Sequence, residues 1–207
     1  MPRIFLCYIT DRRALEPKPL LPSVLEAVRA SVDLVQIRET DLATRDQLTL
    51  VGAAVVEARQ AGSGTRVIVN DRLDVALAVG ADGVHLGTQS MPARVVRRIV
   101  PKDFLVGVSC HSLRETLEAE SAGADYALLG PIFETPSKLQ YGPPLGLETL
   151  RDVAARVTIP LYALGGITVE RVRPCLEAGA TGIAGIAVFQ TSASLAERVR
   201  ELREQGL

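Results

Sequence analysis

Short apolar runs alternate along the chain with longer segments in which apolar residues recur every three or four positions. The runs are rich in Val, Ile and Leu and do not alternate strictly with polar residues, which is typical of parallel strands buried on both faces. The pattern therefore predicts eight strand–helix units and an α/β fold. The predicted strands are residues 3–9, 33–37, 66–69, 83–86, 104–108, 126–129, 160–163 and 182–186, and the predicted helices are residues 23–30, 45–61, 73–79, 93–99, 113–122, 147–156, 169–178 and 194–204.

An internal repeat indicates how these units are arranged. Residues 78–87 (AVGADGVHLG) recur as residues 121–130 (SAGADYALLG) and 177–186 (EAGATGIAGI). Each copy predicts a helix that ends at a glycine, a tight turn and a buried strand. The first strand runs into residues 10–13 (TDRR) with no glycine-rich phosphate fingerprint, which disfavours a doubly wound open sheet. We therefore expect residues 1–207 to form a single-domain (β/α)8 TIM barrel.

Composition excludes several classes of protein. The formal net charge is -1 and the chain has four Tyr, four Phe and no Trp, which argues against a nucleic-acid-binding surface. Cys7, Cys110 and Cys175 lie far apart and form no CxxC pair, as in proteins of a reducing compartment. The apolar runs are too short for a membrane span. We expect a cytoplasmic protein with neither nucleic acid nor membrane as a partner.

In such a barrel the chemistry lies at the carboxyl ends of the strands. The polar residues at those ends are Gln36, Arg38, Glu39, Asn70, Asp71, His85, Ser109, His111, Thr135, Ser137 and Lys138. The last three belong to residues 134–146 (ETPSKLQYGPPLG), a segment with three prolines and two glycines that we interpret as an active-site loop.

Glycines follow the last two predicted strands. Gly165 and Gly166 come after the seventh, and Gly185, Ile186 and Ala187 come at the end of the eighth. Backbone amides approach an anion closely where no Cβ intervenes, and these two loops commonly hold phosphate in barrels of this type. We expect a phosphate site here. The alternative is that the glycines only make tight turns.

Several of the charged residues have a structural alternative. Arg38 and Lys138 are cations suited to an anionic substrate, although Arg38 could instead pair with Glu39 or Asp71. Asp71 could cap the next helix rather than hold a metal. A magnesium site recruits a second carboxylate or substrate phosphates, and residues 87–92 (GTQSMP) contain no carboxylate.

The two histidines have different expected roles. His85 lies within a strand, which favours a buried histidine with satisfied hydrogen bonds. His111 follows Ser109 at a strand end and is a candidate acid or base near neutral pH, or else a residue at the start of a helix capped by Ser112. Cys110, which lies beside it, is expected to be a structural thiol.

An ordered series of motifs now identifies a family. The chain resembles the thiamine phosphate synthase / TenI superfamily over nearly its whole length. This resemblance implies a (β/α)8 barrel, a role in thiamine metabolism and a phosphorylated thiazole as substrate. The motifs that carry the resemblance are residues 35–39 (VQIRE), 69–72 (VNDR), 80–87 (GADGVHLG), 107–111 (GVSCH), 130–135 (GPIFET), 165–167 (GGI) and 178–180 (AGA).

Two activities occur in that superfamily. The synthase joins a pyrimidine carried on diphosphate to a thiazole phosphate, releases pyrophosphate and uses Mg²⁺. The TenI-type enzyme is a tautomerase that shifts a proton on a thiazole carboxylate phosphate and needs no cofactor. The resemblance carries over Gln36, Arg38, Asn70, Ser109, Thr135 and Lys138 as substrate-binding residues, with Asp71 as metal ligand if the chain is a synthase. The strand ends add Ser137, Gly165, Gly166, Gly185, Ile186 and Ala187 to the expected substrate-binding set.

Departures from the synthase pattern favour the tautomerase. Thr40 replaces a lysine, residues 88–91 (TQSM) lack the second metal carboxylate, and Ala187 replaces a serine. Losing a cation and a metal ligand should cost a diphosphate reaction several powers of ten in rate. Against this, Pro131 has the synthase form, where tautomerases carry histidine. We therefore expect a tautomerase that uses His111, Lys138 and Arg38 as catalytic residues.

Two alternatives stay open beside the tautomerase. One is a thiamine phosphate synthase that takes a pyrimidine diphosphate as its second substrate. The other is a non-catalytic regulator that binds thiazole phosphate, because hallmark residues of both enzymes are missing. Barrels of this kind commonly associate, so a homo-oligomer is compatible with all three.

Overall fold

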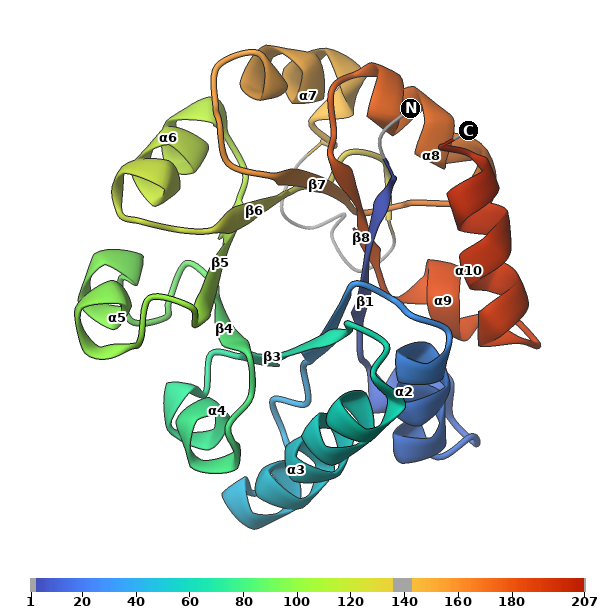
Figure 1. Cartoon of the computed structure of the whole chain (residues 1–207). Helices are drawn as coiled ribbons and strands as arrows, with labels where there is room; N and C mark the ends of the chain where they lie inside the picture. The colour runs from blue at the N-terminus through green and yellow to red at the C-terminus, as the bar shows by residue number, and fades with distance from the viewer. Residues whose placement is uncertain (1–2, 136–142, 207) are drawn as a thin grey trace.

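The computed structural model describes residues 3–135 and 143–206, and in that part of the chain eight parallel strands close into a barrel in sequence order. Each strand pairs with its neighbours along the chain, and β1 also pairs with β8, which closes the ring (Figure 1). The predicted (β/α)8 TIM barrel is confirmed. The strands are β1 (Phe5–Ile9), β2 (Leu34–Ile37), β3 (Arg66–Asn70), β4 (Gly83–Leu86), β5 (Leu105–Cys110), β6 (Tyr126–Leu129), β7 (Leu161–Leu164) and β8 (Gly182–Gly185).

Helices surround the ring of strands on the outside (Figure 1). Two short ones, α1 and α9, follow β1 and β8 and were not predicted, because four residues are too few to show a helical period. The helices are α1 (Arg12–Leu15), α2 (Leu20–Arg29), α3 (Thr44–Ala61), α4 (Leu73–Val79), α5 (Ala93–Ile99), α6 (Leu113–Ser121), α7 (Gly146–Ala154), α8 (Val169–Glu177), α9 (Ala187–Gln190) and α10 (Leu195–Glu204). None of the helices in the described residues is long and apolar enough to cross a membrane.

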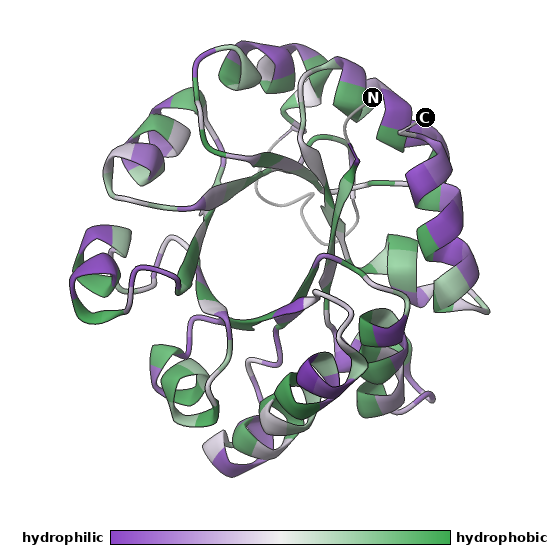
Figure 2. Ribbon diagram, viewed as in Figure 1, coloured by the Kyte–Doolittle hydropathy of each residue, from purple (hydrophilic) through white to green (hydrophobic). Residues whose placement is uncertain are grey.

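The apolar side chains form two separate layers. One fills the space between strands and helices, and Figure 2 shows hydrophobic residues along the strands and mixed faces on the helices. The other lies inside the barrel and consists of Cys7, Ile9, Leu34, Ile68, Tyr126, Leu128, Tyr162 and Ala184. Both faces of each strand are therefore buried, which explains why the strand sequences do not alternate.

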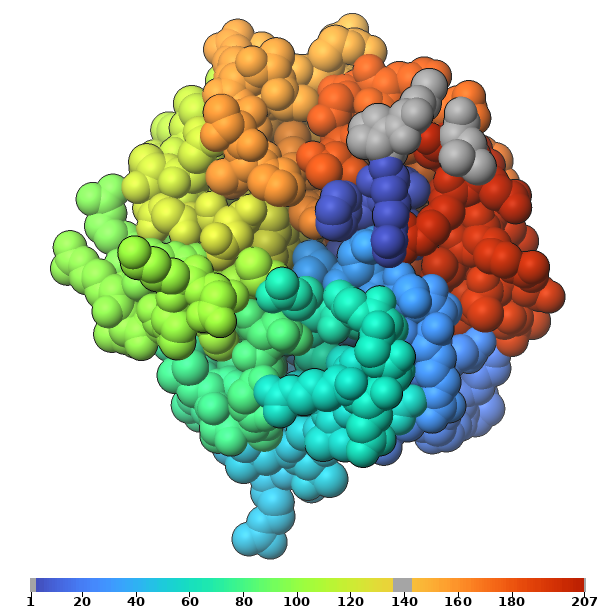
Figure 3. Space-filling model, in the orientation of Figure 1, coloured from blue at the N-terminus to red at the C-terminus, as the bar shows by residue number. Residues whose placement is uncertain are grey.

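The barrel interior needs a glycine to accommodate its aromatic rings. A Cβ at Gly107 would lie 2.1 Å from Cζ of Tyr126, so a larger residue on β5 would displace the tyrosine. Tyr126 packs edge-on against Tyr162 with ring centroids 5.5 Å apart. The space-filling view shows successive segments of the chain following one another around the axis (Figure 3).

The internal repeat has a hydrogen-bonding function that recurs four times. The residue that precedes each even-numbered strand accepts from a main-chain N–H at the start of the strand before it. Asp33 accepts from Leu6, Asp82 from Val67, Asp125 from Val106, and the Thr181 hydroxyl from Leu161, at 2.8, 2.7, 2.7 and 3.3 Å.

The four turns that carry these acceptors also share a backbone conformation. The residue two positions before each acceptor has positive φ: Ser31 (58°), Gly80 (66°), Gly123 (86°) and Gly179 (96°). The three glycines are the helix ends that the repeat predicted. The fourth copy, around Ser31, is not evident from the sequence because a serine occupies the left-handed position.

The two ends of the described chain meet beside the starts of β1 and β2. The Arg203 guanidinium of α10 donates to the carbonyl oxygens of Ile4 (2.7 Å) and Ser31 (2.9 Å) and pairs with Asp33 (3.0 Å). The last helix is thereby fixed to the first strand and to the turn before the second.

Candidate active site

The carboxyl ends of β2 and β3 bring together an amide pair. Gln36 is 1% exposed, and its Nε2 donates to Oδ1 of Asn70 at 3.0 Å. The Oε1 atom of Gln36 is buried and has no hydrogen-bond partner in the part of the chain that the structure describes. A buried acceptor without a partner is costly, so this oxygen is suited to an N–H of a ligand at the barrel mouth.

Arg38 follows Gln36 and is exposed. The suggested ion pair with Glu39 or Asp71 does not form, and the Arg38 guanidinium has no acidic partner among the described residues. Its main-chain N–H instead donates to the Thr10 hydroxyl (2.9 Å), which donates to the buried Glu39 carboxylate (2.7 Å). The chain around Arg38 is therefore fixed to β1, while its cation stays available for an anionic ligand.

Glu39 itself is a structural carboxylate. It accepts from the Arg12 amide at 3.2 Å in addition to Thr10. Burial raises the pKa of Glu39, and the Thr10 hydroxyl and Arg12 amide act in the opposite direction. Its contacts join the loop after β1 to the loop after β2 and so shape the mouth of the barrel.

Asp71 does not cap a helix. It has a left-handed backbone (φ 62°), and its N–H donates to the His85 carbonyl at 2.8 Å. Arg72 takes the capping position of α4 without a side-chain cap. The carboxylate of Asp71 is exposed and makes no hydrogen bond or ion pair with the described residues. A non-glycine residue held in this conformation often marks a functional position, which keeps Asp71 a candidate metal ligand.

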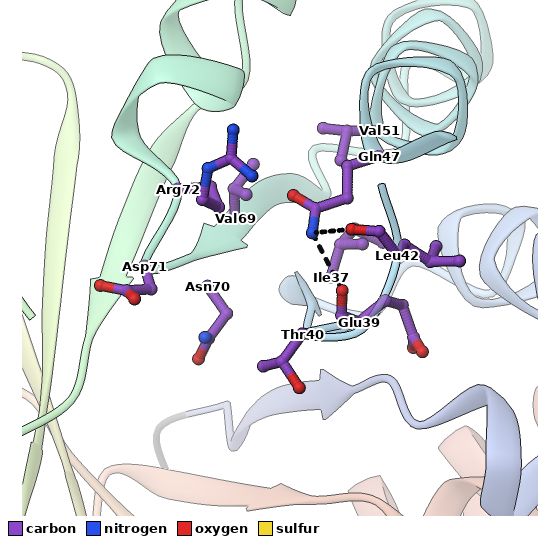
Figure 4. Close-up of a pocket in the computed structure, with 10 residues that line it drawn as sticks. All are labelled: Ile37, Glu39, Thr40, Leu42, Gln47, Val51, Val69, Asn70, Asp71 and Arg72. Atoms are coloured by element: carbon purple, nitrogen blue, oxygen red, sulfur yellow. Dashed lines mark hydrogen bonds between the residues drawn. The ribbon is translucent and has the colours of Figure 1, made fainter. Parts of the chain in front are cut away.

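A pocket of about 120 Å³ opens between the loops after β2 and β3 and the start of α3 (Figure 4). Its lining includes the polar side chains of Thr40, Asn70 and Asp71 and the apolar side chains of Ile37 and Val69 (Figure 4). The side chain of Gln47 donates to the main-chain oxygens of Glu39 (3.0 Å) and Leu42 (3.1 Å), which holds the β2 loop against α3.

Ser109 is held from inside the barrel by His85. The Ser109 Oγ lies 2.8 Å from Nε2 of His85, whose Nδ1 lies 3.3 Å from the Tyr126 hydroxyl. His85 is 2% exposed, and burial, with a smaller effect of the Arg38 charge, lowers its pKa to about 3. The imidazole is therefore neutral at physiological pH, and it is a buried histidine with satisfied hydrogen bonds, as expected.

His111 is exposed and lies just before Ser112, the residue that caps α6. Its Nδ1 lies 3.1 Å from Oε2 of Glu115, and its main-chain N–H donates to the same oxygen at 2.8 Å. Ser112 caps α6 by accepting from the Glu115 N–H. The helix-start alternative thus describes its position. A catalytic role for His111 remains a prediction.

The glycines after β7 adopt a conformation suited to an anion. Gly165 and Gly166 have φ of 94° and 64°, and a Cβ at Gly166 would lie 2.5 Å from the Glu134 carbonyl oxygen. After β8, Gly185 is buried, Ile186 precedes α9 and Ala187 begins it. Both groups of residues lie at the same end of adjacent strands. Thr135 is half-buried beside this region, whereas Ser137 and Lys138 lie outside the described residues.

The residues present fit a magnesium ion bound together with substrate. The described residues contain no cluster of three acidic, histidine or cysteine side chains that could hold a metal. In the loop after β4, which has no carboxylate, Ser90 accepts from the Gly87 N–H at 2.8 Å. Mg²⁺ is commonly held by one carboxylate, waters and substrate phosphates, a set for which Asp71 supplies the protein part.

The fold defines a (β/α)8 barrel protein with polar groups gathered at the carboxyl ends of its strands. The model of the family described as thiamine monophosphate synthase matches residues 6–189. The chain belongs to this family of thiamine-biosynthesis enzymes.

Individual proteins similar to this chain also have names that belong to this family. The thiamine-phosphate synthase of Syntrophomonas wolfei is 38% identical over 96% of this chain and 94% of its own length. The thiamine-phosphate synthase of Clostridium novyi is 40% identical over 89% of this chain and 88% of its own length. The solved thiamine phosphate pyrophosphorylase of Pyrococcus furiosus superposes with a TM-score of 0.87 at 37% identity, covering 98% of this chain and 95% of its own. These names support the synthase alternative better than the tautomerase that the sequence analysis favoured.

Proposed function

We propose that this chain is a thiamine-phosphate synthase, which joins a pyrimidine carried on diphosphate to a thiazole phosphate and releases pyrophosphate. The observation that supports the proposal is that two separate groups of residues suited to an anion lie at one barrel mouth. One is Arg38, which has no acidic partner among the described residues, with Asn70 and Asp71 after β2 and β3, and the other is Gly165–Gly166 after β7. A reaction between a diphosphate and a monophosphate uses both regions as phosphate sites, whereas the tautomerase substrate has one phosphate and would place at most its carboxylate at the first region.

The β2–β3 region suits the diphosphate. As the bond from the methylene carbon to the diphosphate oxygen breaks, negative charge gathers on the leaving group, and the Arg38 guanidinium, which forms no ion pair in the described part of the chain, can stabilise it. Asp71 and the diphosphate oxygens would together hold Mg²⁺, which when bound neutralises part of that charge. The buried Gln36 Oε1 accepts an N–H of the pyrimidine and orients its ring.

The β7 region suits the thiazole phosphate, which must present its ring nitrogen to that carbon. The main-chain N–H groups of Gly166 and Ile167 donate to no acceptor in the described residues and can bind phosphate oxygens. Ser109, held by the neutral His85, offers a hydroxyl between the two regions on β5. Binding both substrates in fixed positions supplies much of the rate enhancement.

The proposal is tested by assaying the purified chain with both phosphorylated precursors, with and without Mg²⁺, and following thiamine phosphate by chromatography. We expect Mg²⁺-dependent formation of thiamine phosphate. Asp71→Asn should lower the rate about 10²-fold, because it removes the protein's charged metal ligand. The exposed Asp103→Asn is the matched control and should keep the parent rate.

A parallel assay follows isomerisation of the thiazole carboxylate phosphate. Isomerisation without synthase activity would replace the proposal by the tautomerase. Binding of thiazole phosphate without either reaction would replace it by the regulator.

A further inference from the structure

The peptide planes of the β7 loop are fixed from outside the barrel. The Gly165 carbonyl accepts from the Phe133 N–H at 3.1 Å, and the Gly166 carbonyl accepts from Nη1 of Arg171 at 2.6 Å. In a trans peptide the C=O and the following N–H point in opposite directions. Fixing these two carbonyls therefore also fixes the directions of the N–H groups of Gly166 and Ile167, which have no acceptor in the described chain.

Arg171 also contacts the second element that shapes this loop. Its guanidinium carbon lies 4.6 Å from the centroid of the Phe133 ring, a cation–π geometry. Phe133 belongs to the segment after β6, whose main chain packs directly on the two glycines. One side chain thus holds both the carbonyl of the loop and the segment that covers it.

Among the described residues Arg171 has only a charge interaction with the neighbouring Glu170 on α8 and no hydrogen-bonded acidic partner. It lies in the first turn of α8, is exposed, and forms no ion pair with the described residues. Arginine suits this position because its planar fork can donate to a carbonyl while its face stacks on an aromatic ring. A lysine offers the charge without the stacking surface.

We propose that Arg171 is a positioning residue for phosphate binding, which holds the Gly166 and Ile167 N–H groups in the direction of the anion. The proposal rests on the assignment of the thiazole phosphate to the β7 loop made above. Arg171 acts through the Gly166 carbonyl and the Phe133 ring and does not itself need to touch the phosphate.

The experiment measures binding of thiazole phosphate alone by titration calorimetry, together with steady-state kinetics. Arg171→Ala should raise the Kd and the KM for thiazole phosphate about tenfold and leave kcat within about twofold, because ground state and transition state lose the same contact. Arg171→Lys should recover less than half of the binding free energy that Arg171→Ala loses. Arg173→Ala, an exposed arginine on the same helix, is the control and should bind as the parent does.

A double-mutant cycle separates positioning from simple attraction between charges. Phe133→Leu should weaken binding less than Arg171→Ala does, and the double variant should be no weaker than Arg171→Ala alone. The weaker binding of thiazole phosphate by Arg171→Ala should persist at 0.5 M NaCl, where a purely long-range charge effect is screened. Thermal unfolding checks that each variant is folded.

The outcomes separate this inference from the proposed function. If the parent chain does not bind thiazole phosphate, the proposed function fails. If the parent binds and Arg171→Ala binds as Arg173→Ala does, or if Arg171→Lys binds as the parent does, the positioning role is overturned.

Discussion

At the scale of single residues, His85 illustrates how one buried group links stability to the site. Its imidazole is held between Ser109 and Tyr126 inside the barrel and has a pKa of about 3 because it is buried and close to Arg38. Neutral histidine has one N–H and one free ring nitrogen, so it can satisfy both hydroxyl groups at once. A charged imidazole would have two donors and no acceptor.

The low pKa of His85 predicts how stability changes with pH. In the unfolded chain this histidine binds a proton near pH 6.5, whereas the folded protein does not protonate it until about pH 3. The free energy of unfolding should therefore fall as the pH falls below about 6.5, by up to about 1.4 kcal/mol per pH unit from this group. Urea unfolding at pH 7 and pH 5 measures this change. The difference in the free energy of unfolding between the two pH values should be smaller for His85→Gln than for the parent.

The chain has only two histidines, which provides the control. His111→Gln should keep the pH dependence of the parent, and carboxylates such as Glu39 titrate in every variant and cancel in the comparison. An unchanged pH dependence in His85→Gln would show that the buried histidine does not carry the effect.

At the scale of elements, the same hydrogen bond recurs at the base of every second strand. Asp33, Asp82 and Asp125 each accept from the N–H of a neighbouring strand, and Thr181 does so with a hydroxyl. The sequence repeat is therefore a device that pairs the barrel strands two by two. The positive-φ residue at the end of each preceding helix turns the chain so that the acceptor can reach.

Removing one of these acceptors should destabilise the barrel. Asp82→Ala leaves the Val67 N–H without its partner at 2.7 Å and should lower the free energy of unfolding by about 1–3 kcal/mol. Asp82→Asn keeps an acceptor oxygen, so its free energy of unfolding should fall by less than that of Asp82→Ala. Asp103→Ala changes an exposed aspartate and should stay within about 0.5 kcal/mol of the parent. Equal losses for Asp82→Ala and Asp103→Ala would mean that the repeat has no such function.

Elements with a strong local signal were predictable from the sequence. Apolar runs and glycine-terminated helices gave all eight strands and the closed barrel, because a parallel sheet with both faces buried has a distinctive composition. The two four-residue helices, α1 and α9, were missed. The fifth strand was also predicted too short, since Ser109 and Cys110 continue it to Cys110.

The site was predictable only as far as chain position determines it. Strand ends placed Gln36, Arg38, Asn70, Asp71 and Ser109 at the mouth, and Gly165 and Gly166 after β7. The partners of these groups were not predictable, because Glu39 with Thr10, His85 with Ser109 and Arg171 with Gly166 depend on where side chains meet in space. The common inward direction of alternate residues on β4 and β5 was the one signal that could have linked His85 to Ser109.

At the scale of the whole molecule, the three cysteine thiols are buried in the closed barrel, so their reactivity measures how often the barrel opens. Cys7 lies in β1, Cys110 in β5 and Cys175 in α8, and each is at most 1% exposed. Burial raises their pKa values to about 12, 11 and 11, so thiolate, the reactive form, is scarce at pH 8. The native chain should therefore react slowly with an aromatic disulfide reagent, and the unfolded chain should react at three thiols.

Single-thiol variants then test whether the barrel opens as one unit. Every strand pairs with two neighbours, so removing one breaks two ladders, and we expect opening of any sector to require most of the unfolding free energy. With two cysteines at a time replaced by alanine, the remaining thiol should react at rates that agree within about threefold under native conditions. A much faster reaction at Cys7 than at Cys110 would show instead that β1 separates from the ring on its own, despite the hydrogen bond from Arg203 of α10 to Ile4 at its start.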